Sequence, residues 1–532
     1  MPSPNAQQTI EEVPLKIVGG NLFGRYPKIS IEETFNFIVS DNFLVPYAGY
    51  KNVLDLLSNE QGRGLYSSSV GNIMIAVIGF GVYSITPDLT PNLVGELFTN
   101  TNDVYIAENN NFQICITDGV YVYVYNYSDS SFKTSNPSGP GGALVNFPTT
   151  FSPGYISFQN GQLIIACINT QVWQLSDFNN ALVWPQEPQN QGAIQSKPCT
   201  IQAAVPLPGG GNNLLVFGTN VAESWQYVGS ALFPYQRNPS FNIDYGCLNA
   251  ASIAALENFV VWLSFNEQAG PALSYTTGGP VQNISTDGIA FKFGELTNPE
   301  NCTGFLFRQD GHLIYQFTFI TDNLSYAYDF NSKLFFTVTD DQMNYHIARE
   351  VVFFNNNYYF VSLNAGNIYG FGTQYTDADY GDGNVKQIPK VRICPPLRLA
   401  NQRYFINKSL GFTVENGEPN QGTTTVIPNF GNGNYLLTQD GDYLLTQDGN
   451  YLVTQAGVTT RTSYSEAVDL SISRDGGYSF GSSIRLSMNP TGQRKSRFIF
   501  QRLGIANDTT FQLRFSGFGR FVVTDGICEV SQ

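Results

Sequence analysis

The feature that most constrains this 532-residue chain is a unit of short apolar runs and polar turns that recurs between residues 65 and 388. Each unit has an alternating apolar run, a turn rich in Gly, Asn or Asp, and a second and often a third run. The units begin about 40 to 50 residues apart, at Asn72, Asn111, Asn160, Asn213, Asn258, Gln309 and Val351. Sheets of three or four strands bury their apolar faces when they pack around a ring. The repeat predicts a β-propeller of six or seven blades, with a pair of β-sandwiches as the structural alternative.

The composition agrees with an all-β chain of more than one domain. It has 51 Gly, 30 Tyr and 40 Phe, but only 13% charged residues and 4 Met. Tyr and Phe favour strands, and few stretches have the Ala, Glu, Lys and Leu content that favours helices. A chain of this length also exceeds what one hydrophobic core normally supports.

Both ends of the chain depart from the repeated unit. The first 64 residues form a mostly polar arm with a turn at Pro46 to Gly49, and after Pro389 the sequence changes to prolines, then Asn, Gly and Thr, then strands with more Arg. We expect the arm (1–64) and the C-terminal segment (389–532) to form one β-sandwich-like platform domain, with the propeller (65–388) between them.

A shorter repeat lies within the C-terminal segment. The octapeptides GNYLLTQD, GDYLLTQD and GNYLVTQA place Tyr435, Tyr443 and Tyr451 at equal intervals. Tyr-Leu-Leu-Thr favours a strand, and the Asp-Gly and Gly-Asn pairs favour turns with positive φ. The pattern predicts a β-ribbon over residues 434–456.

The negative charge is concentrated in the first part of the chain. The chain has 27 basic and 42 acidic residues, a net charge of -15. Of these, 15 basic and 11 acidic residues follow residue 385, so the last part carries +4 and the first 385 residues carry -19. Such asymmetry predicts different partners for the two parts.

The sequence contains no pattern of a metal or cofactor site. The seven cysteines are scattered singly, and His312 and His346 are the only histidines, which is too few for a zinc site. We expect buried free thiols, as in a reducing compartment. Asp377, Asp379 and Asp382 lack the spacing and the closing Glu of an EF-hand, and they predict a solvated acidic loop.

Ser473, Asp475, Gly477 and Phe480 match the Asp-box pattern Ser-x-Asp-x-Gly-x-x-aromatic. In that pattern the Asp side chain holds the backbone of a hairpin turn. A sialidase-like glycosidase repeats the box in several blades and uses a Tyr nucleophile with an arginine cluster. Here one box lies outside the predicted propeller, so we expect a rigid hairpin and no catalytic residue.

The densest basic run is Arg494, Lys495 and Arg497, followed by Arg502. On alternating strand positions, such residues predict ion pairs with a neighbouring subunit or a solvated face, and a phosphate or DNA contact is the alternative.

The chain shows no membrane or export signal. Its longest apolar run, Ile73 to Ile78, is far shorter than the roughly 20 residues of a membrane-spanning helix. The polar start lacks the regions of a signal peptide. We expect a soluble protein made in a cytoplasm.

Three stretches carry a family resemblance. The C-terminal stretch has the turn from Asp475 to Phe480, the run Arg497-Phe-Ile-Phe-Gln-Arg502-Leu-Gly504, then Asn507-Asp508 and Phe511-x-Leu-x-Phe515. The N-terminal stretch has Asn21-Leu-Phe23, Asn36 and Leu-Val-Pro-Tyr-Ala-Gly-Tyr at 44–50. The middle stretch has Phe217-Gly218, Glu223-Ser-Trp225 and Trp262-Leu-Ser-Phe265. Together they resemble the tail nozzle proteins of short-tailed bacteriophages, the group that includes the packaged-DNA stabilisation and tail hub proteins.

The resemblance implies a structural virion protein made in the bacterial host. It implies a homo-hexameric ring at the distal end of the tail, docked beneath a head-to-tail adaptor ring, with fibres, spikes or a central plug attached. Such a ring retains packaged double-stranded DNA and conducts it during ejection without sequence-specific binding. An acidic wall suits this role because it repels phosphates.

Two other functions remain open from the residues alone. Aromatic-rich blades and the Asp box also fit a glycan-binding or glycosidase-type propeller that recognises a host receptor. The third hypothesis is a propeller that serves only as a scaffold for host proteins and catalyses no reaction.

Overall fold

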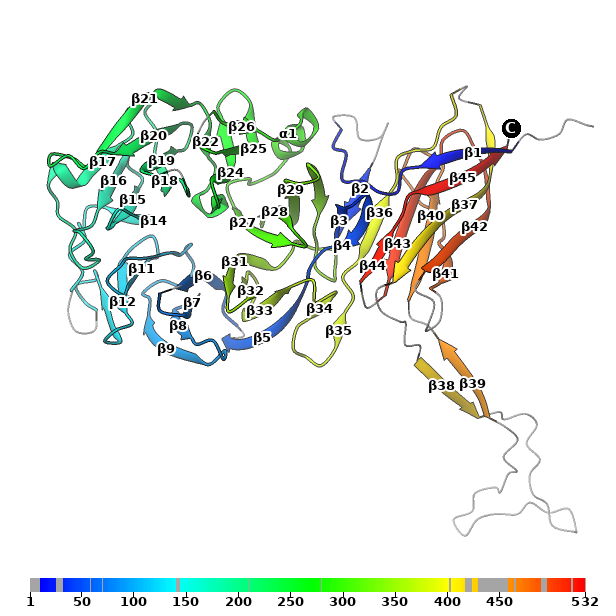
Figure 1. The fold of residues 1–532 in the computed structure, drawn as a ribbon, viewed down its shortest axis with the longest axis horizontal. Helices are drawn as coiled ribbons and strands as arrows, with labels where there is room; N and C mark the ends of the chain where they lie inside the picture. Colours follow the sequence, from blue (N-terminus) through cyan, green and yellow to red (C-terminus); the bar gives the residue numbers. More distant parts are fainter. Residues whose placement is uncertain are drawn as a thin grey trace, which may run out of the picture.

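The computed structural model describes residues 10–24, 32–57, 59–68, 70–139, 144–209, 211–278, 280–400, 403–416, 423–428, 458–463, 466–488, 495–517 and 520–531. Strands make up most of this part, and they form a ring of sheets beside a two-layer sandwich (Figure 1). The predicted propeller and sandwich are both present. Among the described helices, none has the length and apolar character that crossing a membrane requires.

The propeller has seven blades within the described residues. The first blade is β6 (Gly62–Ser68), β7 (Ile73–Ile78), β8 (Gly81–Ile85) and β9 (Pro91–Glu96). The second is β10 (Tyr105–Glu108), β11 (Gln113–Thr117), β12 (Val122–Asn126) and β13 (Ser131–Thr134). The third is β14 (Ser152–Gln159), β15 (Gln162–Ile168), β16 (Val172–Leu175) and β17 (Gln191–Ala193). The fourth is β18 (Ile201–Pro206), β19 (Asn213–Gly218), β20 (Ala222–Tyr227) and β21 (Tyr235–Ile243).

The fifth blade is β22 (Gly246–Cys247), β23 (Ala254–Leu256), β24 (Phe259–Asn266), β25 (Gly270–Thr276) and β26 (Gln282–Asn283), followed by α1 (Asp287–Gly294). The sixth is β27 (Cys302–Gln309), β28 (His312–Phe319), β29 (Leu324–Asp329) and β30 (Leu334–Thr337). The seventh joins β31 (Ala348–Phe354), β32 (Asn357–Ser362) and β33 (Gly366–Gly372) to β5 (Gly49–Leu57). Short strands β34 (Ala378–Asp379) and β35 (Val385–Lys386) extend this last sheet.

The ring is closed by a strand from the other end of the chain. β5 pairs with β33 from Gly366 opposite Leu57 to Gly372 opposite Gly49, and β31 packs against β6. Closure in one hydrogen-bonded sheet removes a free edge. Residues 49–57 belong to the segment predicted as an arm of the platform, so the propeller takes in chain before residue 65.

The blades pack on one another through apolar faces on both sides of each sheet. Between the third and fourth blades, the rings of Trp173 and Trp225 meet at 5.6 Å, and between the fourth and fifth, those of Phe217 and Trp262 meet at 4.9 Å. All seven cysteines are free thiols, and all except the partly exposed Cys199 are buried. The prediction of free thiols is confirmed, and burial raises their pKa.

The sandwich combines strands from both ends of the chain. Its first sheet contains β1 (Ile10–Leu15), β45 (Gly526–Ser531), β37 (Phe405–Asn416), β44 (Phe521–Val523), β4 (Phe43–Pro46) and β3 (Phe37–Ser40), with β42 (Lys495–Ala506) on the other side of β37. Its second sheet contains β36 (Lys390–Ile393), β43 (Thr510–Ser516), β40 (Ala467–Ser473) and β41 (Ile484–Ser487). β1 pairs along its whole length with β45.

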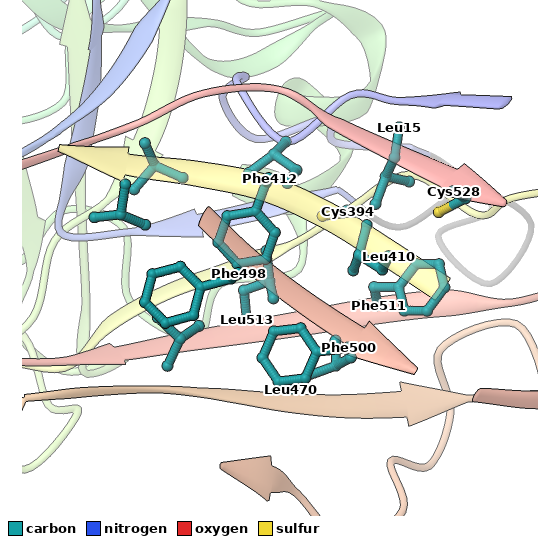
Figure 2. Packing of buried hydrophobic residues seen from close by; sticks show 14 of the residues in the cluster. Leu15, Cys394, Leu410, Phe412, Leu470, Phe498, Phe500, Phe511, Leu513 and Cys528 are labelled. Atoms are coloured by element: carbon teal, nitrogen blue, oxygen red, sulfur yellow. The ribbon is translucent and has the colours of Figure 1, made fainter. Parts of the chain in front are cut away.

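The sandwich core lies between these two sheets. Phe412 on β37 stacks with Phe498 and Phe500 on β42, at ring distances of 5.6 and 6.1 Å. Figure 2 shows these rings facing Leu470 and Leu513 of the second sheet. The inward residues follow the two-residue alternation of a strand, so one face of each sheet is apolar.

The two domains share one hydrogen-bonded sheet. β2 (Glu33–Phe35) pairs with β30 of the sixth blade on one side and with β36 of the sandwich on the other, which makes a sheet of nine strands. β38 (Thr423–Pro428) and β39 (Val458–Ser463) form a ribbon that projects from the sandwich (Figure 1). The repeat with Tyr435, Tyr443 and Tyr451 lies outside the described residues.

Candidate functional site

One face of the sandwich, which we call the outer face, is formed by β42, β37, β45 and β1 and points away from the core. Strand β42 directs Phe498 and Phe500 inward, so the alternate residues Arg497, Ile499 and Gln501 point outward. In an antiparallel sheet with one solvated face, the outward residues are normally polar. The outer face departs from that rule.

Two apolar rows cross the outer face from strand to strand. The first contains Ile499, Gly411, Ile527 and Pro14. The second contains Ile505, Ile406 and Ile10, and it is interrupted between the last two by Ser531, a polar residue that is only 1% exposed. Their isoleucines at 10, 499, 505 and 527 are 59%, 41%, 58% and 50% exposed. A Cβ at Gly411 would meet only backbone oxygens, at 3.8 and 3.9 Å. A hollow of about 300 Å³ therefore lies over this part of the face.

The outer face is charged with opposite signs toward its two sides, basic on the edge strand β42 and acidic on β1 and its neighbour β45. Lys495, Arg497 and Arg502 lie on β42, while Glu12 and Glu529 lie on β1 and β45. Within the described residues, none of the three basic side chains is in an ion pair. Arg502 has a φ of 60°, close to the register shift between Asn407 and Ser409. Arg494, the fourth residue predicted for this interface, lies outside the described residues.

The Asp-box residues form a turn at the end of β40. Asp475 Oδ1 accepts hydrogen bonds from the backbone N–H of Tyr478 and Ser479 at 3.0 and 3.1 Å, and the Ser473 hydroxyl accepts one from the Gly477 N–H at 2.8 Å. Hydrogen bonds from Ser473 and Ser479 lower the pKa of Asp475. All of these bonds stay within the turn. Phe480 is half-buried beside it.

A polar cavity of about 100 Å³ is lined by residues at or near the first strands of several blades. These strands surround the centre of the ring, so the cavity lies on the propeller axis. Arg349 and Asp103 form an ion pair there, and the Leu65 N–H donates to Glu350 Oε2 at 2.9 Å. Burial raises the pKa of Glu350 to about 7, although the Leu65 N–H and Arg349 partly offset this shift. Tyr105 and Tyr155 also line the cavity.

A Ser–His–Asp arrangement links the two domains. His312 Nδ1 lies 2.9 Å from Asp329 Oδ2, and His312 Nε2 lies 3.1 Å from Ser40 Oγ. The same order of groups occurs in acyl-transfer enzymes. Here Asp329 also accepts hydrogen bonds from the backbone N–H of Asn331 and Ser332, which form its own turn. Ser40 ends a sandwich strand and His312 begins a blade strand, so the network bridges the domains.

The prediction of a solvated acidic loop is wrong for Asp377. This side chain is buried and pairs with Lys390 at 2.9 Å, whereas Asp382 is exposed. Among the described residues, no group of three His, Cys, Asp or Glu side chains could hold a metal ion.

The sequence analysis does not predict the apolar rows of the outer face, although the sequence contains a signal for them. Phe498, Ile499 and Phe500 are consecutive, so apolar side chains must point to both faces of that strand. Ile527 and Ile10 belong to short strands whose pairing partners lie far away in the chain, and their alignment with β42 follows only from the sheet register.

Comparison with family models matches two regions of the chain. Residues 22–376 match the β-propeller model of bacteriophage P22 Gp10, and residues 435–531 match its β-sandwich model. No curated protein matches the chain in sequence.

Solved structures similar to this chain include a virginiamycin B lyase from Staphylococcus aureus, with 11% identity and a TM-score of 0.41 over 61% of this chain and 98% of that one. The WD40 β-propeller domain of Doa1 has 11% identity and a TM-score of 0.37, over 61% of this chain and 97% of that one. Because the two family models together cover most of the sequence, the chain belongs to the bacteriophage P22 Gp10 family of phage tail proteins.

Proposed function

We propose that the chain is the subunit of a ring-shaped tube at the distal end of a short phage tail. Six copies form the ring, which docks beneath the head-to-tail adaptor, retains packaged DNA and conducts it during ejection. The ring also anchors fibres or spikes. In this proposal the protein is made in the host cytoplasm, enters the virion tail and catalyses no reaction.

The observation that carries the proposal is the outer face. Exposed isoleucines in two rows with charged residues toward both sides are typical of a surface that another protein covers. A tube built from one kind of chain is made by cyclic symmetry, in which each copy presents such a surface to its neighbour. The basic edge of β42 supports this contact, because Lys495, Arg497 and Arg502 are exposed and, among the described residues, form no ion pair. They can therefore pair with acidic side chains of a neighbouring copy.

The charge distribution supports the passage of DNA. The first 385 residues carry -19, and a wall of this sign does not release counterions from DNA as a basic channel does. DNA would therefore slide through without binding. The closed propeller supports long-lived assembly, because it exposes few strand edges.

The test is the mass of the purified full-length chain, alone and with its adaptor ring, measured by light scattering together with negative-stain images. We expect a ring with about six times the chain mass of 58.7 kDa, and we expect the double variant Ile499→Asp with Ile527→Asp to remain monomeric in both samples. The control is Leu232→Asp, an apolar-to-acidic change at a propeller side chain that is 84% exposed.

A chain that stays monomeric even with the adaptor would refute the ring. A ring that forms equally well from the double variant would refute the outer face as its contact surface. A loss of assembly in the Leu232→Asp control would show that the added charge, and not the outer face, is responsible.

A further inference from the structure

A second concave site lies where the propeller meets the sandwich, and we call it the junction groove. Its volume is about 620 Å³, within the range of sites that bind small molecules and peptides. Its floor is the shared sheet, from β2 and β36 across to β43, β40 and β41. The groove is complete within one chain, so the inference does not depend on the ring.

The floor changes from apolar to charged along one straight row. Neighbouring strands place the row's residues side by side, in the order Phe35, Val391, Arg514, Asp469 and Arg485. Four strand spacings of about 4.8 Å give the row a length of about 19 Å. A ligand along it meets Phe35 and the 5% of Val391 that is exposed at the propeller end, and Arg514 and Arg485 on either side of Asp469 toward the sandwich end.

Arg514 is the charged residue of the row whose guanidinium group is available to bind a ligand. Its cross-strand neighbour Asp469 already accepts two hydrogen bonds from Arg485, from Nε and Nη2, both at 2.8 Å. Within the described residues, Arg514 is exposed and in no ion pair. A guanidinium in this position binds a carboxylate with two parallel hydrogen bonds.

The apolar end is formed by Met343 together with Phe35 and Val391. Met343 is 43% exposed and has a φ of 65°, a conformation that a bulky residue rarely adopts. Asp340 Oδ1 holds this turn by accepting from the backbone N–H of Gln342 and Asn344 at 2.9 and 2.8 Å. The turn thus presents a flexible apolar side chain at the groove, as adaptable binding surfaces do.

We propose that the junction groove binds an extended peptide segment of a partner protein, with an apolar side chain over Phe35 and Val391 and a carboxylate on Arg514. The midpoint between Phe35 and Val391 lies one and a half strand spacings, about 7 Å, from Arg514. In an extended peptide, side chains two residues apart point the same way and are separated by about 6.8 Å. The recognised segment therefore reads apolar, any residue, acidic.

The test uses arrays of synthetic hexapeptides and the fluorescently labelled full-length chain. One array contains peptides in which Leu, Phe or Met precedes Glu by two positions, and a second array has Gln in place of Glu. We expect at least tenfold weaker binding to the Gln array, since a charge-assisted pair is lost. Arg514→Gln should abolish the preference for Glu, and Met343→Ser should weaken binding to both arrays.

The matched control is Arg520→Gln, which removes an exposed arginine that lies outside the groove and pairs with Asp310. It should bind both arrays like the unmodified chain, and all variants should unfold at the same temperature. Equal binding to the two arrays, an undiminished preference in Arg514→Gln, or binding to neither array would each overturn the proposal. Concentration-dependent self-association that Arg514→Gln removes would instead identify the occupant as a second copy.

Discussion

Lys390 Nζ lies 2.9 Å from Asp377 Oδ1, and the two side chains are only 2% and 1% exposed. Lys390 also donates to the Thr376 carbonyl at 3.1 Å, and Asp377 accepts from the Ile388 N–H at 3.1 Å. Lys390 begins β36 in the shared sheet, and Asp377 precedes the short strand that extends the seventh blade. The pair therefore ties the end of the propeller to the start of the sandwich.

Removing one member of this pair should be costly. Lys390→Met leaves an uncompensated buried carboxylate, and we expect a loss of about 3–5 kcal/mol in the free energy of unfolding. The double variant Lys390→Met with Asp377→Leu should recover much of that loss, because no buried charge remains. Urea denaturation followed by circular dichroism measures both effects. A double variant as unstable as Lys390→Met would show that packing, and not the charge, causes the loss.

The error over Asp377 shows where sequence patterns stop being informative. Three carboxylates within six residues look alike in the sequence, yet only Asp377 lies opposite Lys390 in the folded chain. Strand periodicity predicted the blades well because each blade is made of consecutive strands. It could not predict that β5 completes the seventh blade, because β5 and β33 are separated by most of the propeller. The outer face and the junction groove depend on sheet register between distant strands, which residue spacing does not encode.

Arg392 fixes the N-terminal segment to the shared sheet. Its buried guanidinium donates to the carbonyls of Ile17 and Gly20 at 2.7 and 3.2 Å, to Thr34 Oγ1 at 3.0 Å and to Glu32 Oε2 at 2.8 Å. Arg392→Met leaves all four acceptors without this donor, and we expect a loss of about 3–5 kcal/mol. Limited proteolysis with mass spectrometry should detect faster cleavage before residue 32.

Arg520 provides the control for that change, because its ion pair with Asp310 is exposed. Arg520→Met should change stability by less than about 1 kcal/mol and leave the cleavage pattern unaltered. Resistance of Arg392→Met to the protease would mean that other contacts, such as the pairing of β1 with β45 and the hydrogen bond from the Val18 N–H to Asp525, hold the N-terminal segment without Arg392.

Glu350 should make the stability of the propeller depend on pH. Its pKa is about 7 in the folded chain, against an ordinary value of 4.5 for a glutamate. Between these values the folded chain keeps a proton that the unfolded chain releases, so unfolding is increasingly favoured as pH rises from about 4.5 to 7. Glu350→Gln should remove this dependence, and its stability relative to the unmodified chain should increase by up to about 3 kcal/mol by pH 8. Denaturation at a series of pH values measures the difference, and parallel pH profiles for the two proteins would contradict the raised pKa.

The seam between the first and last blades leaves no space for one extra methyl group. A Cβ at Gly62 would overlap Val361 Cγ2 and lie 2.6 Å from the Ser362 carbonyl oxygen, both on β32 of the seventh blade. Val361 is buried, and its β-branched side chain has few alternative rotamers. We expect Gly62→Ala to lower the free energy of unfolding by about 1–3 kcal/mol and to speed hydrogen exchange in β6 and β32. Gly411→Ala is the control, because its Cβ meets nothing closer than 3.8 Å, and it should leave stability unchanged or slightly higher. If the two variants are equally stable, the closing seam must be able to shift, and ring closure rests on the pairing of β5 with β33 and not on close packing between the blades.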